Sequence, residues 1–199
     1  MSGTNDAEPF YKKKAGSKPL SVSRDGRFLL FQLSDPKARE DLWILPLKGE
    51  HEAKLLLGSE FKEFDGRFSP DMSRIAYQSD ESGDIEVYVC ELSETSRGVE
   101  LEAGERKMIS DGGGTGPRWG REGKELYYRD RDGSVMVVEF TGDRFSSPKS
   151  LFPAVPLTTL YQSNWDAHPD GDLFLLESPV KNNSSSFNII LNWTSLLEQ

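Results

Sequence analysis

Hydrophobic and polar positions follow one pattern four times along the chain. In each copy a short apolar strand leads into a polar turn with one acidic residue, and a second strand of aliphatic and aromatic residues follows at once. The turn acids lie 46, 51 and 48 residues apart, at Asp25, Asp71, Glu122 and Asp170. Short strands at such a period, with weak helical periodicity, are typical of four-stranded propeller blades. The pattern therefore predicts an all-β fold, a β-propeller with four blade repeats of mostly four antiparallel strands.

The turn acids also indicate where the strands of each repeat should lie. Second strands are expected at residues 28–32, 74–78, 125–129 and 173–177. Third strands, rich in β-branched and aromatic residues, are expected at residues 41–47, 85–89, 135–139 and 187–193. Fourth strands are expected at residues 53–57, 106–110 and 149–152. Phe68 and Trp119 belong to two innermost strands, so they are predicted to be buried between neighbouring blades.

The fourth repeat ends without an outer strand. We divide the chain into an N-terminal segment, residues 1–17, and a four-repeat propeller, residues 18–199. Residues 8–14 precede the first repeat and are candidates for the missing strand, within one chain or by exchange between two copies, because an uncovered strand edge invites aggregation. Two alternatives stay open: a four-bladed ring, or the last four blades of a larger ring.

Several motifs resemble the WD40-like (PD40) propeller repeats of the TolB type. They are residues 68–71 (FSPD), 77–83 (YQSDESG), 117–119 (PRW), 123–128 (GKELYY) and 190–193 (ILNW). More narrowly, they resemble the C-terminal propeller region of bacterial proteins, some of which are fused to serine/threonine kinases. The chain carries no kinase motif, so the resemblance implies an interaction platform without kinase activity. It also implies a protein or peptide partner and a periplasmic or extracytoplasmic location.

Composition and charge narrow the classes of partner. The chain has 199 residues, a net charge of −9 and one cysteine, Cys90. An acidic protein with a single basic run, at residues 12–14, is unsuited to a nucleic-acid backbone. No apolar run approaches the ~18–20 residues that cross a bilayer, and residues 1–7 lack the apolar core of a signal peptide. We therefore expect no nucleic-acid partner, no direct membrane insertion and no cofactor.

Motifs that superficially suggest chemistry have simpler structural interpretations. Residues 130–133 (DRDG) lack the spacing of a calcium loop and fit a hairpin turn. Residues 112–116 (GGGTG) lack the spacing of a phosphate loop and fit a crossing between blades. His51 has no second histidine at metalloprotease spacing, and His168 occupies a turn position that holds serine in two other repeats. The repeated turn acids fit backbone hydrogen bonding within their turns. No catalytic or metal-binding residue is predicted.

One set of residues carries a functional expectation. Arg67, Arg118 and Asp166 each lie four residues before a turn acid, and Trp165 precedes Asp166. On innermost strands these equivalent positions would converge near the propeller axis. We predict that these four residues line an axial mouth, with Trp165 more exposed than the other tryptophans. The arginines then either form structural salt bridges across the channel or capture an anionic group, such as a peptide carboxylate.

The function expected from these observations is that of a non-catalytic module that binds a protein segment or a small ligand at its axial face. Two alternatives remain. The chain could be the closing portion of a larger sensor propeller from a membrane kinase, or a propeller hydrolase or lyase.

Overall fold

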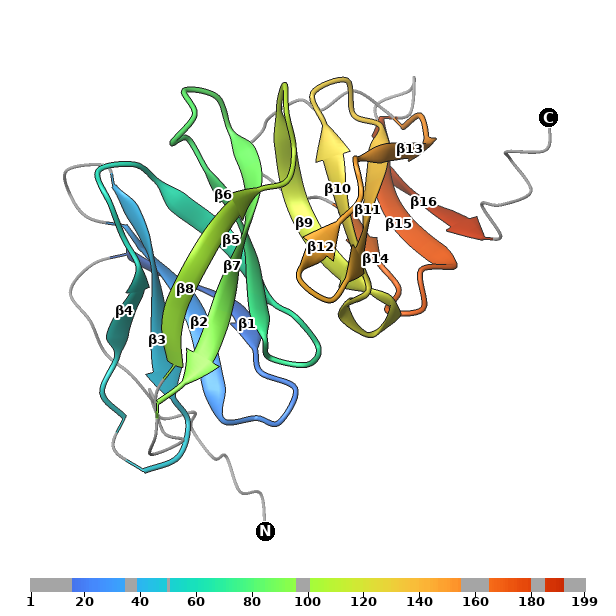
Figure 1. Cartoon of the computed structure of the whole chain (residues 1–199). Coiled ribbons are helices and arrows are strands. Elements are labelled where there is room, and N and C mark those ends of the chain that lie inside the picture. Colours follow the sequence, from blue (N-terminus) through green and yellow to red (C-terminus); the bar gives the residue numbers. More distant parts are fainter. Residues whose placement is uncertain are drawn as a thin grey trace, which may run out of the picture.

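The computed structural model describes residues 16–34, 39–49, 51–95, 101–154, 165–179 and 185–191, with side chains as far as residue 176. Within these ranges every regular element is a strand, except for the short 3-10 helix η1 (Arg121–Gly123). The strands form four antiparallel sheets, which follow one another along the chain (Figure 1).

We number the sheets in chain order. Sheet 1 contains β1 (Gly16–Val22), β2 (Phe28–Ser34), β3 (Glu40–Pro46) and β4 (Lys54–Leu57). Sheet 2 contains β5 (Glu63–Phe68), β6 (Arg74–Ser79), β7 (Glu86–Glu94) and β8 (Leu101–Met108). Sheet 3 contains β9 (Gly114–Gly120), β10 (Glu125–Asp130) and β11 (Val135–Thr141), with β12 (Arg144–Phe145) and β13 (Lys149–Phe152) both paired to β11. Sheet 4 contains β14 (Trp165–Ala167), β15 (Leu173–Pro179) and β16 (Ser185–Leu191).

The second strand of every sheet begins at the residue that the turn acids predicted. One outer strand differs: β8 was expected at residues 106–110, but it begins at Leu101 and ends at Met108. The β7–β8 hairpin is longer than predicted, because β7 continues to Glu94, which pairs with Leu101. Polar residues dominate this extension, so its apolar pattern was too weak to reveal it. The closing strand expected at residues 8–14 lies outside the described residues.

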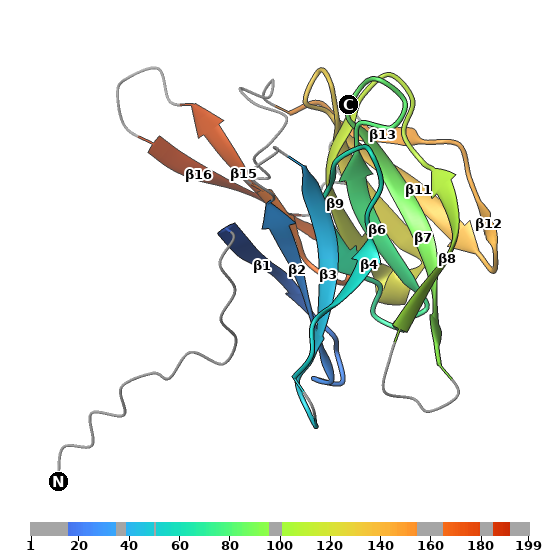
Figure 2. The same ribbon diagram turned by 90° about the vertical axis from the view of Figure 1, so that its left-hand side faces the viewer.

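Apolar side chains fill the spaces between consecutive sheets. One cluster joins sheets 1 and 2 and contains Phe68, a second joins sheets 2 and 3 and contains Trp119, and a third joins sheets 3 and 4 and contains Trp165. Phe68 is 8% exposed and Trp119 is 9% exposed, so their predicted burial is confirmed. The first strands of the sheets contact one another in the order β1, β5, β9 and β14 (Figure 1). We call these four the axial strands. Figure 2 shows the four strands of sheet 1, β1 to β4, side by side.

The DRDG motif, residues 130–133, and the GGGTG motif, residues 112–116, were predicted to form a hairpin turn and a crossing between blades. Residues 130–133 form the β10–β11 hairpin turn, in which the Gly133 N–H donates to the Asp130 carbonyl oxygen. Gly112 and Gly113 end the crossing from β8 to β9, and residues 114–116 of the same motif begin β9. Buried side chains of sheet 2 hold this crossing, because Gln78 accepts a hydrogen bond from the Gly116 N–H and Glu86 accepts one from the Gly113 N–H.

The turn acids behave as predicted in two of the four turns. Asp25 accepts hydrogen bonds from the Arg27 N–H and the Ser23 hydroxyl, and Asp71 makes the equivalent contacts with Ser73 and Ser69. Hydrogen bonds from Ser23 and Arg27 lower the pKa of Asp25 to about 2. Glu122 instead lies in η1 with φ +57°. It lines a pocket, as does Asp170.

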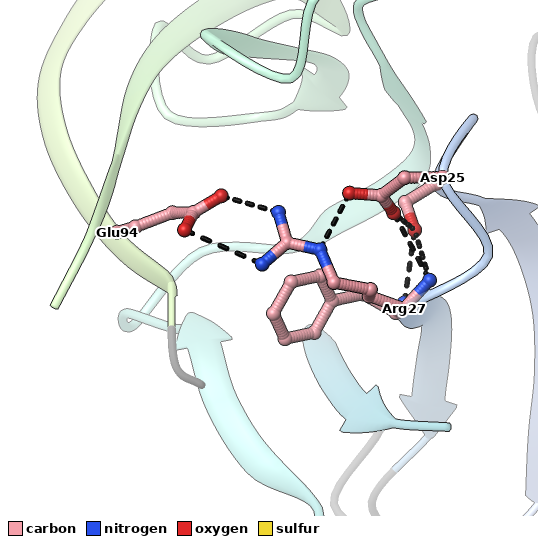
Figure 3. Close-up of polar contacts among 5 residues, drawn as sticks. Asp25, Arg27 and Glu94 are labelled. Atoms are coloured by element: carbon pink, nitrogen blue, oxygen red, sulfur yellow. Dashed lines mark hydrogen bonds and ion pairs between the residues drawn. The ribbon is translucent and has the colours of Figure 1, made fainter. Parts of the chain in front are cut away.

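An ion pair also links the first turn of sheet 1 to sheet 2. Figure 3 shows the Arg27 guanidinium group between the carboxylates of Asp25 and Glu94. Its Nε lies 2.6 Å from Asp25 Oδ2, and its Nη atoms contact both oxygens of Glu94, at the end of β7. All three side chains are about one-third exposed or more, so solvent screens this ion pair and we expect its contribution to stability to be small.

Glu63, the first residue of β5, is fully buried. Ser59 donates a hydrogen bond to its Oε1, whereas its Oε2 has no hydrogen-bond partner in the described part of the chain. Burial raises the pKa of Glu63, and the nearby Asp41 carboxylate adds to this effect. The folded chain therefore holds this proton more tightly than the unfolded chain does.

We expect Glu63→Gln to raise the free energy of unfolding near pH 7. Ionising Glu63 costs stability as the pH rises above its ordinary pKa of 4.5, and the amide cannot ionise. The advantage of the variant should shrink as the pH falls toward 4.5. Urea denaturation of both proteins across this range measures the difference, and a variant that is less stable near neutrality would contradict the assignment.

Candidate functional site

The C-terminal ends of the axial strands and the turns that follow them surround one pocket of about 610 Å³. All four sheets contribute to it, and we call it the axial pocket. Its volume is within the usual range of ligand sites, about 300–1,000 Å³. Its lining residues are Val22, Arg24, Arg67, Phe68, Ser69, Pro70, Arg118, Trp119, Glu122, Trp165, Asp166, Ala167, Pro169 and Asp170.

Asp65 joins the two arginines of this pocket. It lies on β5 with φ +48°, at a point where the β5–β6 register shifts between Phe64 and Arg67. Its carboxylate lies 2.9 Å from Arg67 Nη2 and 3.8 Å from Arg118 Nη1. Since Asp65 is only 6% exposed, little solvent screens these contacts. The bulge thus places one buried anion between two cations from neighbouring sheets.

Arg118 uses all three of its guanidinium nitrogens. Nε lies 3.2 Å from Asp166 Oδ1, Nη2 donates to the Trp165 carbonyl oxygen at 3.1 Å, and Nη1 donates to the Pro117 carbonyl oxygen at 2.8 Å. Its guanidinium carbon also lies 5.7 Å from the centre of the Trp165 ring, within cation–π range. Burial, together with the charge of Arg67, lowers the pKa of Arg118, although an arginine stays charged under ordinary conditions. Arg118 therefore ties sheet 3 to sheet 4.

All four residues selected from the sequence line the axial pocket. Arg118 contacts both Asp166 and Trp165, and Arg67 joins them through Asp65. The expectation that Trp165 would be more exposed is wrong, because it is 5% exposed and stacks on Phe174 of β15. Its indole Nε1 is buried and has no hydrogen-bond partner among the described residues.

Sequence reasoning missed Asp65 and the rim of the pocket. An acid two positions before Arg67 on one strand was a usable signal, since such residues share a face of a regular strand. The bulge that turns Asp65 toward both arginines had no such signal. Arg24, Glu122 and Asp170 are exposed lining residues contributed by the turns. The rim therefore carries a cation from sheet 1 and anions from sheets 3 and 4.

Contacts between two turns hold the acidic side of this rim. The Arg121 N–H donates to the Pro169 carbonyl oxygen at 2.5 Å, which joins the turn of sheet 3 to that of sheet 4. Arg121 Nε lies 2.9 Å from Glu125, and Glu125 accepts a hydrogen bond from the Tyr127 hydroxyl. A Cβ atom at Gly171 would overlap that hydroxyl, so the close approach of the two turns requires glycine there. Glu122 and Asp170 are thereby fixed on the same side of the pocket.

The described residues include no group of three or more His, Cys, Asp or Glu side chains arranged to hold a metal ion. The same residues form no helix that is long and apolar enough to cross a membrane.

Comparisons with known proteins identify the fold. No protein-family model matches the sequence, and no match is found among curated proteins. TolB from Acinetobacter baumannii superimposes with a TM-score of 0.64 at 18% identity, over 91% of this chain and 42% of TolB. A candidate TolB from Agrobacterium tumefaciens gives 0.61 at 14% identity, over 91% and 60% of the two chains. A candidate 6-phosphogluconolactonase from Bacteroides uniformis gives 0.54 at 14% identity, over 88% and 55%.

The chain thus spans less than two thirds of the length of each of these proteins. At such low identities the likeness concerns the fold alone. The resemblance inferred from the repeat motifs is supported at this level, while these structures give no support to a link with kinases. The all-β architecture and these similarities together establish a TolB-like β-propeller fold.

Proposed function

We propose that this chain is a non-catalytic module of four propeller blades that binds an extended protein segment at its axial pocket. The observation that carries the proposal is the convergence of all four sheets on one pocket, which is lined by aromatic side chains and by exposed charges of both signs. Each sheet corresponds to one sequence repeat, which supports four blades. TolB-like folds among the similar structures favour a binding platform.

The charge arrangement suits a peptide better than a simple anion. Arg118 already directs every guanidinium nitrogen at an oxygen of the protein, so it positions Asp166 and Trp165 rather than receiving a ligand. Arg67 contacts Asp65 through Nη2 and the Gly66 carbonyl oxygen through Nη1, and its side chain, 23% exposed, also lines the pocket. An anionic group of the ligand would lie between Arg67 and exposed Arg24.

Cationic or hydrogen-bond-donating groups of the ligand would lie on the opposite side, beside Glu122 and Asp170. Apolar side chains of the ligand would contact Phe68 and the exposed Val22. A protein segment supplies all three kinds of group along one extended chain, whereas a small anion would use only the basic side. The sequence left two roles open for the arginines, structural salt bridges or capture of an anionic group. In this interpretation they have both roles, since they form salt bridges and also shape the binding surface.

Three further expectations from the sequence have less support: a hydrolase function, an extracytoplasmic location and a larger ring. The candidate lactonase among the similar structures is the reason to retain a hydrolase as an alternative function. The described lining of the pocket, however, contains no histidine or cysteine to act as a base or nucleophile. An extracytoplasmic location follows only from the likeness to TolB. A larger ring is compatible with the share of TolB that the chain covers.

A library of random ten-residue peptides displayed on phage tests the proposed function. Peptides selected on the wild-type chain should bind the Arg24→Ala and Glu122→Gln variants at least about tenfold more weakly, a loss of about 1.4 kcal/mol. Both residues are exposed, so neither change disturbs the packing between sheets. Arg144→Ala, on exposed β12, is the matched control and should bind like the wild type. Peptides that bind all four proteins equally would overturn the proposal.

A further inference from the structure

The outer edge of sheet 4 differs from the other outer edges. Sheets 1, 2 and 3 each place a further strand beside their third strand, whereas sheet 4 ends at β16 in the described part of the chain. β16 pairs with β15 over seven residues, from Ser185 opposite Pro179 to Leu191 opposite Leu173. Within the described residues, its other edge therefore presents a row of backbone N–H and C=O groups that can pair with another strand.

The sequence of β16 lacks the charged residues that disfavour strand addition at the outer edges of the other sheets. The outermost strands of the other sheets all carry charged residues: Lys54 in β4, Glu102, Glu105, Arg106 and Lys107 in β8, Arg144 in β12 and Lys149 in β13. β16 reads SSFNIIL, with no charged residue and no proline. Charged residues and proline are the usual means of preventing strand addition at an edge, so β16 is chemically permissive for it.

We propose that the β16 edge is a self-association surface, on which β16 of a second copy pairs in the antiparallel direction about a two-fold axis at Asn188. A two-fold axis places each residue near its own copy, so like charges would oppose a charged strand, and β16 has none. Full overlap of the seven residues puts Asn188 opposite itself, with Phe187 opposite Ile189 of the other copy. Two three-stranded sheets would become one sheet of six strands.

Residues 8–14 are the competing occupant within one chain. The described crossings from an outer strand to the next axial strand take five residues between β4 and β5 and five between β8 and β9. A strand that ended at residue 14 would leave one residue before β1 begins at Gly16. This difference in length favours the second copy over residues 8–14 in that register.

Disulfide trapping tests the proposal on the full chain. In an antiparallel pair, residues directly opposite have Cα atoms about 4.5–5.5 Å apart, which a disulfide can bridge. Under mild oxidation at about 50 μM, Asn188→Cys should form a covalent dimer in most of the protein. Leu175→Cys, on the neighbouring strand β15, is the matched control and should stay monomeric. Cys90 does not compete, since it is fully buried and burial raises its pKa to about 11.

Ile189→Lys provides a second test of the proposal, because it places a charge in β16. Position 189 pairs with Leu175 of β15, so the added lysine lies within the strand whose edge is proposed to associate. Added to Asn188→Cys, it should reduce the covalent dimer at least about fivefold, and light scattering of the wild type should give about twice 22.4 kDa. Equal trapping of both cysteine variants would overturn the proposal. A full-length protein that stays monomeric and dimerises only after deletion of residues 1–15 would also overturn it, in favour of residues 8–14.

Discussion

Trp119→Ala is expected to lower the free energy of unfolding by about 3–5 kcal/mol, the usual cost of removing a buried tryptophan from a core. Trp119 is 9% exposed and lies in the cluster between sheets 2 and 3, with its ring 5.3 Å from that of Phe140. Its indole N–H also donates a 3.0 Å hydrogen bond to the Arg67 carbonyl oxygen, across the sheet boundary. Removal would therefore open a cavity and break a contact beside the axial pocket.

Chemical denaturation of the wild type, Trp119→Ala and Trp119→Phe measures this effect. The phenylalanine variant keeps most of the packing but loses the hydrogen bond and part of the indole volume, so it should lose about 1–2 kcal/mol. An unchanged denaturation midpoint for the alanine variant would show that the two sheets do not pack through this residue.

Asp65→Asn is expected to lower the free energy of unfolding by about 2–3 kcal/mol. This change leaves two arginines without their shared buried anion. Removing one partner of a fully buried ion pair costs about 3–5 kcal/mol. We expect less here, because the Arg67 side chain is 23% exposed and asparagine can still accept one hydrogen bond. Asparagine also tolerates the left-handed backbone of this position, so the substitution tests the charge rather than the turn.

Asp166→Asn is the matched comparison for Asp65. It removes a carboxylate that contacts the same arginine, but the Asp166 side chain is 70% exposed, so its loss should cost less than about 1 kcal/mol. Denaturation curves that rank the two variants in the opposite order would contradict the assignment of Asp65 as the buried link between the arginines.

Much of the fold could be predicted because the repeats share one register. Counting from each turn acid gave the first residue of all four second strands, since a short turn leaves no freedom in where the next strand begins. The same count placed Arg67, Arg118 and Asp166 on the axial strands that line the pocket. Periodicity carried this information without any knowledge of tertiary contacts.

Other features depended on geometry that a periodic pattern does not encode. A bulge and a positive φ bring Asp65 between the arginines, and a regular strand would not. Glu122 differs from Asp25 and Asp71 because its turn forms η1, so it projects into the pocket lining instead of capping its own turn. The polar extension of the β7–β8 hairpin lacked the alternation that identifies a strand. Irregular backbone therefore accounts for most of the site features that the sequence did not predict.

Hydrogen exchange of the chain with and without a selected peptide tests the central claim most directly. The account predicts slower exchange at residues 22–24, 67–70, 118–122 and 165–170, which are contributed by all four sheets to the axial pocket. Exchange in the outer strands β4, β8 and β13 should not change. Protection confined to those outer strands, or to a single sheet, would contradict a binding site at the axis.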